Sequence, residues 1–263
     1  MTDGPRVAAR HLGMRFELRG RPLVALEDVN LQVRDREFCC IVGPSGCGKS
    51  TFLRILAGLE RQSAGELEID VRDPRRPAVA MVFQEQSIFP WMTVEDNVGY
   101  GLRMRGVHAN VRRGIVAHYL EKVGLTTFAR AYPHQLSGGM KQRASVARAF
   151  ATDPEILLMD EPFASVDEQT RSLLQEELLR VWETDRKTVV YITHSIDEAL
   201  ILGDRVVVMS ARPGHVKAEI DVGLARPRSV YELKSTPEFA ELVARVWEPL
   251  RREVLMSYGA LAS

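Results

Sequence analysis

Short apolar runs separated by longer helical stretches extend over most of this sequence. The run 38–42 ends at Gly43 and is typical of a buried strand that enters a glycine-rich turn. After the turn, apolar residues at helical spacing predict a helix that Gly58 ends in a left-handed conformation. Further apolar runs predict short strands at residues 79–83, 156–159, 189–192 and 206–209. Buried strands that alternate with helices favour an α/β fold with a mainly parallel sheet covered on both faces.

Two regions depart from this alternation and are predicted to be helical. Residues from about 86 to 151 lack strand-like runs, so we predict a helical subdomain inserted into the core. One of its helices is expected to stop at Gly124 and to carry the apolar stripe Val111, Ile115, Tyr119 and Val123.

Near the end of the chain, Thr236 and Pro237 predict the start of another helix, which Pro249 interrupts or ends. The apolar stripe of this helix consists of Phe239, Leu242, Val243 and Val246. We therefore divide the chain into a main domain of residues 1–225 and a C-terminal helical extension of residues 226–263.

The composition narrows the classes of function. With 45% apolar and 27% charged residues and a formal net charge of +0, the chain of 263 residues has no electrostatic reason to bind nucleic acid. No window approaches 18 consecutive apolar residues, so other chains are expected to supply any membrane-spanning part. Three closely spaced cysteines fit neither a disulfide framework nor a zinc site, and Cys39 and Cys40 are expected to be small buried hydrophobes in a reducing compartment.

The segment after the first apolar run matches the phosphate-binding pattern G-x-x-x-x-G-K-[ST]. Its glycines let successive backbone N–H groups converge on a phosphate, and the helix that follows points its positive end at the same place. The lysine adds a compact positive charge, and the last hydroxyl can ligate Mg²⁺. A glycine-rich turn with an incidental lysine is the alternative, but the flanking strand and helix favour nucleotide binding. The segment consists of Gly43, Pro44, Ser45, Gly46, Cys47, Gly48, Lys49 and Ser50.

Two acids, Asp160 and Glu161, end another apolar run. They are expected at the carboxyl edge of the sheet, where ligands of parallel α/β sheets bind. Asp160 can hold Mg²⁺, and Glu161 can polarise the water that attacks a γ-phosphate. Because strands often end in acidic residues, this pair alone is weak evidence for a catalytic site. Together with the phosphate-binding segment it indicates one.

A second anion cradle is predicted at Ser137, which with Gly138 and Gly139 opens a helix about twenty residues before the acidic pair. Alone, this pattern also fits an ordinary capped helix. Two cradles beside one lysine loop suggest two half-sites, which a head-to-tail pair of chains would complete by two-fold symmetry.

Together these motifs closely resemble those of the ABC transporter ATPases, whose signature is the run LSGGMKQR at residues 136–143. Gln84 matches the family's glutamine loop, Asp167 the loop that crosses the dimer interface, and His194 the switch histidine that contacts the γ-phosphate. The resemblance covers roughly residues 6–215 and implies an ABC-type P-loop core, with an antiparallel β part near the N-terminus.

The same resemblance assigns roles to individual residues. Glu161, His194 and Lys49 are the expected catalytic residues, and Ser50, Gln84 and Asp160 the expected Mg²⁺ ligands. Gly138, Gly139, Ser137 and Gln142 are expected to contact ATP bound to a partner chain. The expected contacts to ATP within the chain are Phe16, which would stack on adenine, the segment from Gly43 to Ser50 already given, Thr51 and Gln84.

Residues 89–98, 191–199 and 204–214 look like the branch of the family that imports nitrate, sulfonates or taurine. Membership would imply Mg²⁺-dependent ATP hydrolysis by a dimer of identical or sister chains at the cytoplasmic face of the membrane. The implied partners are transmembrane permease subunits and, indirectly, a solute-binding protein. A soluble ABC-type ATPase in cofactor assembly is the main alternative, and residues 84–98 are the chief argument against it.

Overall fold

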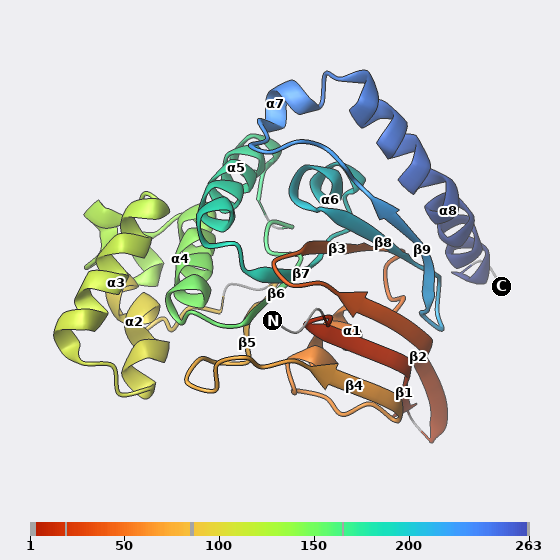
Figure 1. The fold of residues 1–263 in the computed structure, drawn as a ribbon, viewed down its shortest axis with the longest axis horizontal. Coiled ribbons are helices and arrows are strands. Elements are labelled where there is room, and N and C mark those ends of the chain that lie inside the picture. Colours follow the sequence, from red (N-terminus) through yellow and green to blue (C-terminus); the bar gives the residue numbers. More distant parts are fainter. Residues whose placement is uncertain (1–3, 19, 85–86, 165, 262–263) are drawn as a thin grey trace.

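The molecule contains two β-sheets, of which the larger is central and the smaller lies along one side (Figure 1). The computed structural model describes residues 4–18, 20–84, 87–164 and 166–261. An antiparallel sheet has the order β2-β1-β4, from β1 (Val7–Leu18), β2 (Arg21–Val33) and β4 (Ala64–Ile69). A six-stranded sheet has the order β5-β6-β7-β3-β8-β9, from β3 (Phe38–Val42), β5 (Val79–Val82), β6 (Ile156–Asp160), β7 (Thr188–Ile192), β8 (Arg205–Met209) and β9 (Val216–Asp221). Among the strands described for the larger sheet, only β9 pairs antiparallel with its neighbour, so the core is the mainly parallel sheet that the sequence predicts.

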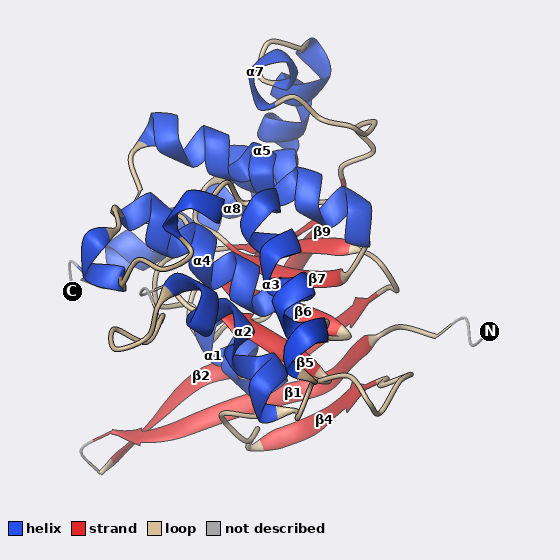
Figure 2. Ribbon diagram, turned by 90° about the vertical axis from the view of Figure 1, so that its left-hand side faces the viewer, coloured by secondary structure: helices blue, strands red, loops and turns tan. Residues whose placement is uncertain are grey.

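The helices divide between the core, an inserted subdomain and the C-terminal part. Figure 2 shows most of them on one side of the central strands and the antiparallel sheet on the other. The core holds α1 (Lys49–Leu56), α5 (Glu168–Asp185) and α6 (Ile196–Leu202), and the chain ends in α7 (Val230–Leu233) and α8 (Pro237–Leu261). The insertion holds α2 (Val94–Met104), α3 (Ala109–Lys122), the 3₁₀ turns η1 (Thr126–Phe128) and η2 (Pro133–Gln135), and α4 (Gly138–Ala151).

Alternate residues of the central strands pack on opposite faces of the larger sheet. In β3, Cys40 and Val42 pack with the cluster that includes residues of α5, α6 and α8, whereas Cys39 and Ile41 pack with α1 and the antiparallel sheet. Because both faces are covered, the strands are continuous apolar runs. All three cysteines are buried and free, as the sequence predicts for Cys39 and Cys40.

The predicted strands and the helical insertion are confirmed, and two details of the helices are wrong. Gly58 and Gly124 take the left-handed conformation expected at helix ends, with φ of 69° and 63°. Of the predicted stripe, Val123 is buried and Ile115 and Tyr119 pack against the subdomain core, but Val111 is 57% exposed, because α3 also turns Val116 and Leu120 inward. Pro249 lies inside α8 and does not end it. Proline removes one backbone donor, and burial of Leu250 just beyond it continues to hold the helix on the core.

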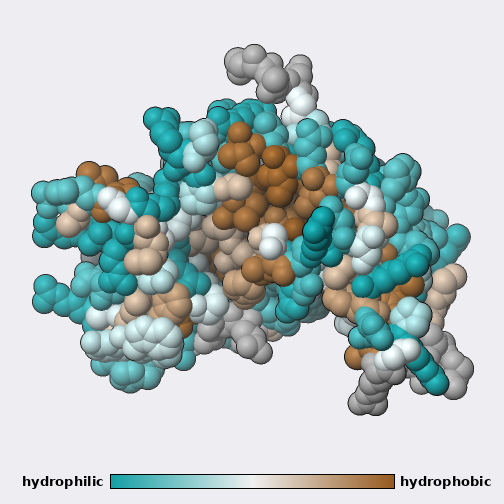
Figure 3. Space-filling view, turned by 90° about the horizontal axis from the view of Figure 1, so that it is seen from below, coloured by the Kyte–Doolittle hydropathy of each residue, from teal (hydrophilic) through white to brown (hydrophobic). Residues whose placement is uncertain are grey.

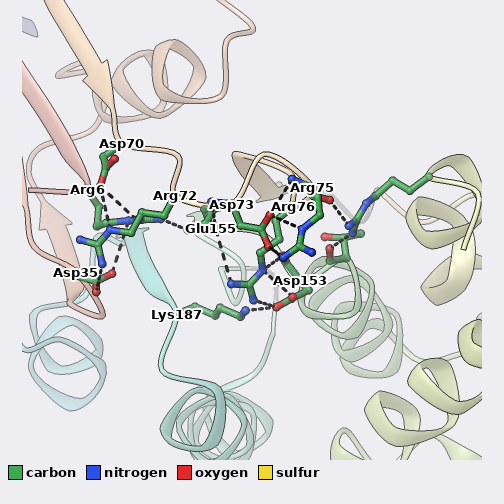
Figure 4. A network of polar contacts seen from close by, with 12 residues as sticks. Arg6, Asp35, Asp70, Arg72, Asp73, Arg75, Arg76, Asp153, Glu155 and Lys187 are labelled. Carbon is green, nitrogen blue, oxygen red and sulfur yellow. Dashed lines mark hydrogen bonds and ion pairs between the residues drawn. The ribbon is translucent and has the colours of Figure 1, made fainter. Parts of the chain in front are cut away.

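A network of ion pairs joins four loops at the edge where β1 begins (Figure 4). Arg6 is 1% exposed and pairs with Glu155, with Asp70 at 3.4 Å and with Asp35 at 3.7 Å. Asp153 accepts hydrogen bonds from Arg76, at 2.8 Å from Nε, and from Lys187. Buried charge requires pairing of this kind, so the network fixes the β4–β5 loop against the loops before β6 and β7.

On the side that Figure 3 shows, much of the surface is polar, and the largest group of apolar side chains lies near the middle. Among the helices that the structure describes, none has the length and apolar character needed to cross a bilayer.

Candidate nucleotide-binding site

The phosphate-binding segment lies between the end of β3 and the start of α1, the context that its pattern requires. Gly46 and Gly48 have φ of 74° and 109°, a region that side chains with a Cβ rarely adopt. A Cβ on Gly48 would also lie 2.6 Å from Leu26 Cδ2 and 2.8 Å from the Ala25 carbonyl oxygen. Glycine is therefore needed at this position both for its conformation and for the close approach of β2.

Lys49 begins α1 and is 6% exposed. Its ammonium donates to the carbonyl oxygens of Gly43, at 2.8 Å, and Pro44, at 3.0 Å. These bonds satisfy a buried cation and hold it within the loop, where the helix N-terminus adds a positive potential. The arrangement suits an anionic ligand.

Ser50 and Asp160 meet beside this loop, because β6 ends next to α1. The Ser50 hydroxyl donates to Asp160 Oδ1 at 3.0 Å. Burial raises the pKa of Asp160 above its ordinary value of 3.8, the Ser50 hydrogen bond opposes the shift, and the Glu161 carboxylate adds to it. A divalent cation would relieve this cost of burying a carboxylate, and hydroxyl and carboxylate oxygens are ligands that Mg²⁺ prefers.

Glu161 and His194 follow the adjacent strands β6 and β7, and His194 Nδ1 lies 3.2 Å from Glu161 Oε2. The backbone of Glu161 has φ of 43°, which is unfavourable for a residue with a side chain and costs on the order of 1 kcal/mol. Its N–H donates to the Ile192 carbonyl at 3.0 Å, so pairing with β7 maintains this conformation. The result is a carboxylate and an imidazole that can act on the same water.

A cavity of about 400 Å³ opens over the loop. Nine of its lining residues were predicted from the sequence. They lie on β1, on the phosphate-binding loop and the start of α1, and at Gln84 and Glu161. Leu23, Ala25 and Arg212 also line it and were missed. Leu23 stands opposite Phe16 in the β1–β2 register, a pairing that only the structure shows. The lining residues are Phe16, Leu23, Ala25, Ser45, Gly46, Gly48, Lys49, Ser50, Thr51, Gln84, Glu161 and Arg212.

The remaining predicted residues lie outside this lining. Gly43, Pro44 and Cys47 belong to the loop itself, and Asp160 and His194 contact lining residues. Ser137 caps α4 and accepts from the Met140 N–H at 3.3 Å.

Asp167 caps α5, and hydrogen bonds from Thr170 lower the pKa of Asp167. Gln142 is 1% exposed, and its Nε2 has no hydrogen-bond partner within the described residues. Gly138 and Gly139 open α4, where a Cβ on Gly139 would meet Thr170 of α5 at 3.1 Å. The contacts of these residues to a partner chain stay predictions.

Within the described ranges, no group of three or more His, Cys, Asp or Glu side chains is placed to hold a metal ion. A cation at Ser50 and Asp160 would therefore depend on oxygens from other groups, such as the Gln84 amide and a bound phosphate.

The sequence is similar to those of ATP-binding proteins of ABC transporters. The sequence model of the ABC transporter family matches residues 26–164. An uncharacterised ABC transporter ATP-binding protein of Methanocaldococcus jannaschii is 45% identical over 96% of this chain and 94% of its own length. A nitrate import ATP-binding protein of Synechocystis is 40% identical, over 92% of this chain and 93% of its own. A taurine import ATP-binding protein of Rhizobium johnstonii is 44% identical, over 88% and 91%.

Among solved structures, a dimeric ATP-binding cassette in a post-hydrolysis state with ADP and Pi superimposes with a TM-score of 0.72. It is 32% identical and covers 83% of this chain and 100% of its own. The expected fold class is thereby confirmed. The chain belongs to the ABC transporter family, as an ATP-binding subunit with ATPase activity in the branch that its nitrate and taurine import relatives represent.

Proposed function

We propose that the chain is the ATP-hydrolysing subunit of an importer for a small solute such as nitrate, a sulfonate or taurine, and works as a head-to-tail dimer. The observation that supports this most is the cavity in which the Lys49 loop lies beside the Glu161–His194 pair. A phosphate cradle and a carboxylate poised for general-base catalysis share one edge of the sheet. The import proteins among its relatives support the transport role.

In this proposal the adenine lies toward Phe16 and Leu23 and the phosphates lie on the Lys49 loop. Lys49 neutralises charge on the β- and γ-phosphates, and backbone N–H groups of the loop bind their oxygens. Ser50, Asp160 and Gln84 would hold Mg²⁺, which when bound neutralises further charge on the phosphate oxygens. Glu161 orients and polarises the attacking water, and His194 holds the carboxylate in place and contacts the γ-phosphate.

The second half of each site would come from a partner chain. Ser137 caps the 14-residue helix α4 outside the cavity, and the first backbone N–H groups of such a helix suit an anion. Closing two chains head to tail would place each Ser137 cradle over the other chain's ATP, with Asp167 at the interface. Closure excludes bulk water, and ATP would bind the closed state better than ADP, which supplies the differential affinity that drives transport.

An aromatic cluster just after Gln84 is the proposed contact with the permease. Phe89 packs against Tyr100 with ring centroids 4.7 Å apart and against Trp91 at 5.5 Å, and Trp91 is 69% exposed. The buried Asn97 side chain holds this loop, because its amide donates to the carbonyls of Phe89, Met92 and Thr93. An exposed aromatic surface on a fixed loop suits a short cytoplasmic helix of a membrane subunit. The chain would then lie peripherally at the cytoplasmic face, with a solute-binding protein acting through the permease.

The first test is steady-state ATPase activity against protein concentration. Two half-sites predict that specific activity rises with concentration, that Mg²⁺ is required, and that Glu161→Gln is nearly inactive and accumulates as an ATP-bound dimer. Glu241→Gln, a change at an exposed position on α8, serves as the control and is expected to behave like the parent chain. Concentration-independent turnover by a monomer, or normal hydrolysis by Glu161→Gln, would contradict the proposal.

The transport role is tested by uptake of radiolabelled nitrate, taurine and an alkanesulfonate in cells that lack or carry the chain. We expect uptake of one of these solutes to be lost without the chain and restored by it, but not by the Glu161→Gln variant. Unchanged uptake of all three solutes would exclude these substrates for the proposed importer.

A further inference from the structure

Arg212 lines the nucleotide cavity from the β8–β9 loop, far in sequence from the phosphate-binding segment. The side chain is exposed, and in the part of the chain that the structure describes its guanidinium has no ion pair or hydrogen bond. Exposed arginines are usually solvated. This one lies at the wall of a cavity whose charged lining otherwise consists of Lys49 and Glu161.

The loop that carries Arg212 is held rigidly by its own bonds. The Ser210 hydroxyl lies 2.9 Å from the Ala211 carbonyl oxygen and 3.1 Å from that of Pro213, and accepts from the His215 N–H at 2.9 Å. On the β2 side, the Gly214 N–H donates to the Ala25 carbonyl at 3.0 Å. A residue whose backbone is fixed in this way loses less freedom when its side chain binds a ligand.

The β8–β9 loop that carries Arg212 also packs directly against the phosphate-binding segment. A Cβ on Gly214 would lie only 2.0 Å from the Cys47 carbonyl oxygen. Gly43 also packs tightly against the end of β8, since a Cβ there would lie 3.1 Å from the Met209 carbonyl oxygen. Both contacts follow from the parallel pairing of β3 with β8, which brings the ends of these strands together. The Arg212 loop is therefore a second wall of the phosphate site.

Helix α8 anchors this wall through one buried acid. Glu253 is 4% exposed, and its carboxylate accepts from the Ala211 N–H at 2.9 Å and pairs with Lys217 at 3.2 Å. A hydrogen bond to a charged acceptor is stronger than one between neutral groups. The C-terminal helix thus holds the backbone of the residue that precedes Arg212.

We propose that Arg212 is a further nucleotide-binding residue, which pairs with phosphate oxygens, and that Glu253 is the positioning residue that holds its loop. The proposal rests on the proposed function of this cavity as an ATP site. Phosphate is favoured over the base, because the loop abuts the phosphate-binding backbone at Cys47, while Phe16 already offers an aromatic face. A planar guanidinium also matches phosphate geometry and can bind two oxygens at once.

The test is calorimetric titration of the full chain with Mg·ADP and Mg·GDP. Arg212→Gln is expected to weaken both ligands by the same factor, about tenfold, because one charge-assisted bond to phosphate is lost. Arg212→Lys should recover part of this affinity. Arg252→Gln, a change at an exposed arginine on α8, is the matched control and should leave both affinities unchanged.

Glu253→Gln should weaken Mg·ADP about threefold in the parent chain and have no further effect in the Arg212→Gln background. An Arg212→Gln variant with parental affinity, or a loss confined to the adenine nucleotide, would overturn the phosphate contact. Additive losses in the double variant would overturn the positioning role of Glu253.

Lys49→Ala separates the two proposals. If the parent chain binds no nucleotide, or if Lys49→Ala binds as the parent does, the proposed function itself fails. If Lys49→Ala loses binding while Arg212→Gln does not, only the role of Arg212 fails.

Discussion

Gly214→Ala is a one-carbon change that tests whether the β8–β9 loop fixes the phosphate-binding segment. Gly214 does not have positive φ, so alanine is compatible with its backbone conformation and the effect is purely steric. The new Cβ would lie 2.0 Å from the Cys47 carbonyl oxygen, 3.0 Å from Met209 Cε and 3.2 Å from the Cys47 carbonyl carbon. The end of the Met209 side chain is flexible and can move away, but the Cys47 atoms belong to the backbone and cannot rotate out of contact.

The size of the effect follows from the distance that must be gained. A Cβ normally approaches no nearer than 3.0 Å, so either the loop or the Cys47 backbone must move by about 1 Å. Overpacking of this kind costs about 2 kcal/mol of unfolding free energy, which corresponds to a fall in Tm of about 4–8 °C for a chain of this size. A misplacement of about 1 Å in a binding backbone can also weaken function by up to about 100-fold.

Thermal unfolding and Mg·ADP titration of the same samples measure both consequences. Gly114→Ala is the matched control, because Gly114 lies in α3, lacks positive φ and has open space around an added Cβ. That control should raise stability by about 0.5–1 kcal/mol, because alanine favours the helix more than glycine does, and should leave nucleotide affinity unchanged.

Parental stability together with parental ADP affinity in Gly214→Ala would refute the reasoning. Reduced stability with unchanged affinity would show that the loop yields instead of the phosphate-binding segment, and that the two are not rigidly coupled.

Three further predictions concern the rest of the chain. Burial alone would raise the pKa of Asp153, but hydrogen bonds from Arg76 and Lys187 hold that pKa below its ordinary value of 3.8. The Asp153 carboxylate therefore stabilises the folded chain above pH 3.8, and this contribution is lost as the pH falls through the lowered pKa. Asp153→Asn should be less stable by about 1 kcal/mol at pH 7 and equally stable near pH 2 in urea titrations; a constant difference would contradict this. Burial raises the pKa of Cys39 to about 12 and that of Cys40 strongly, so a thiol reagent at pH 8 should label both rapidly in denaturant only; rapid labelling of the folded chain would count against their burial. Asn97→Asp sets a carboxylate against three carbonyls and should lose about 2–4 kcal/mol by urea unfolding, whereas the exposed Asn110→Asp should not; equal midpoints would contradict the proposed role of Asn97.

Those features of the chain whose pattern and physical requirement are both local were predictable from the sequence. The phosphate-binding segment is one such case, because its consecutive backbone N–H groups and its glycines lie within a single turn. The strand runs were equally readable, because a strand buried on both faces is apolar at every position. The exposure of Val111 was not readable, because a helix surface offers several apolar positions and only packing against α2 and α4 selects which of them are buried.

The sequence by itself therefore determined the α/β class and the family of ATP-binding subunits, and it predicted the residues of the nucleotide site. Tertiary structure decided which residues from distant segments share the cavity. The 3.2 Å contact between Glu161 and His194 exists because β6 and β7 are neighbours, and Arg212 reaches the site because β8 lies beside β3. Glu253 lies 42 residues beyond Ala211, whose backbone N–H donates a hydrogen bond to the Glu253 carboxylate, and only the docking of α8 brings the two together. Strand order and helix docking depend on the sum of many buried contacts, which no local pattern encodes.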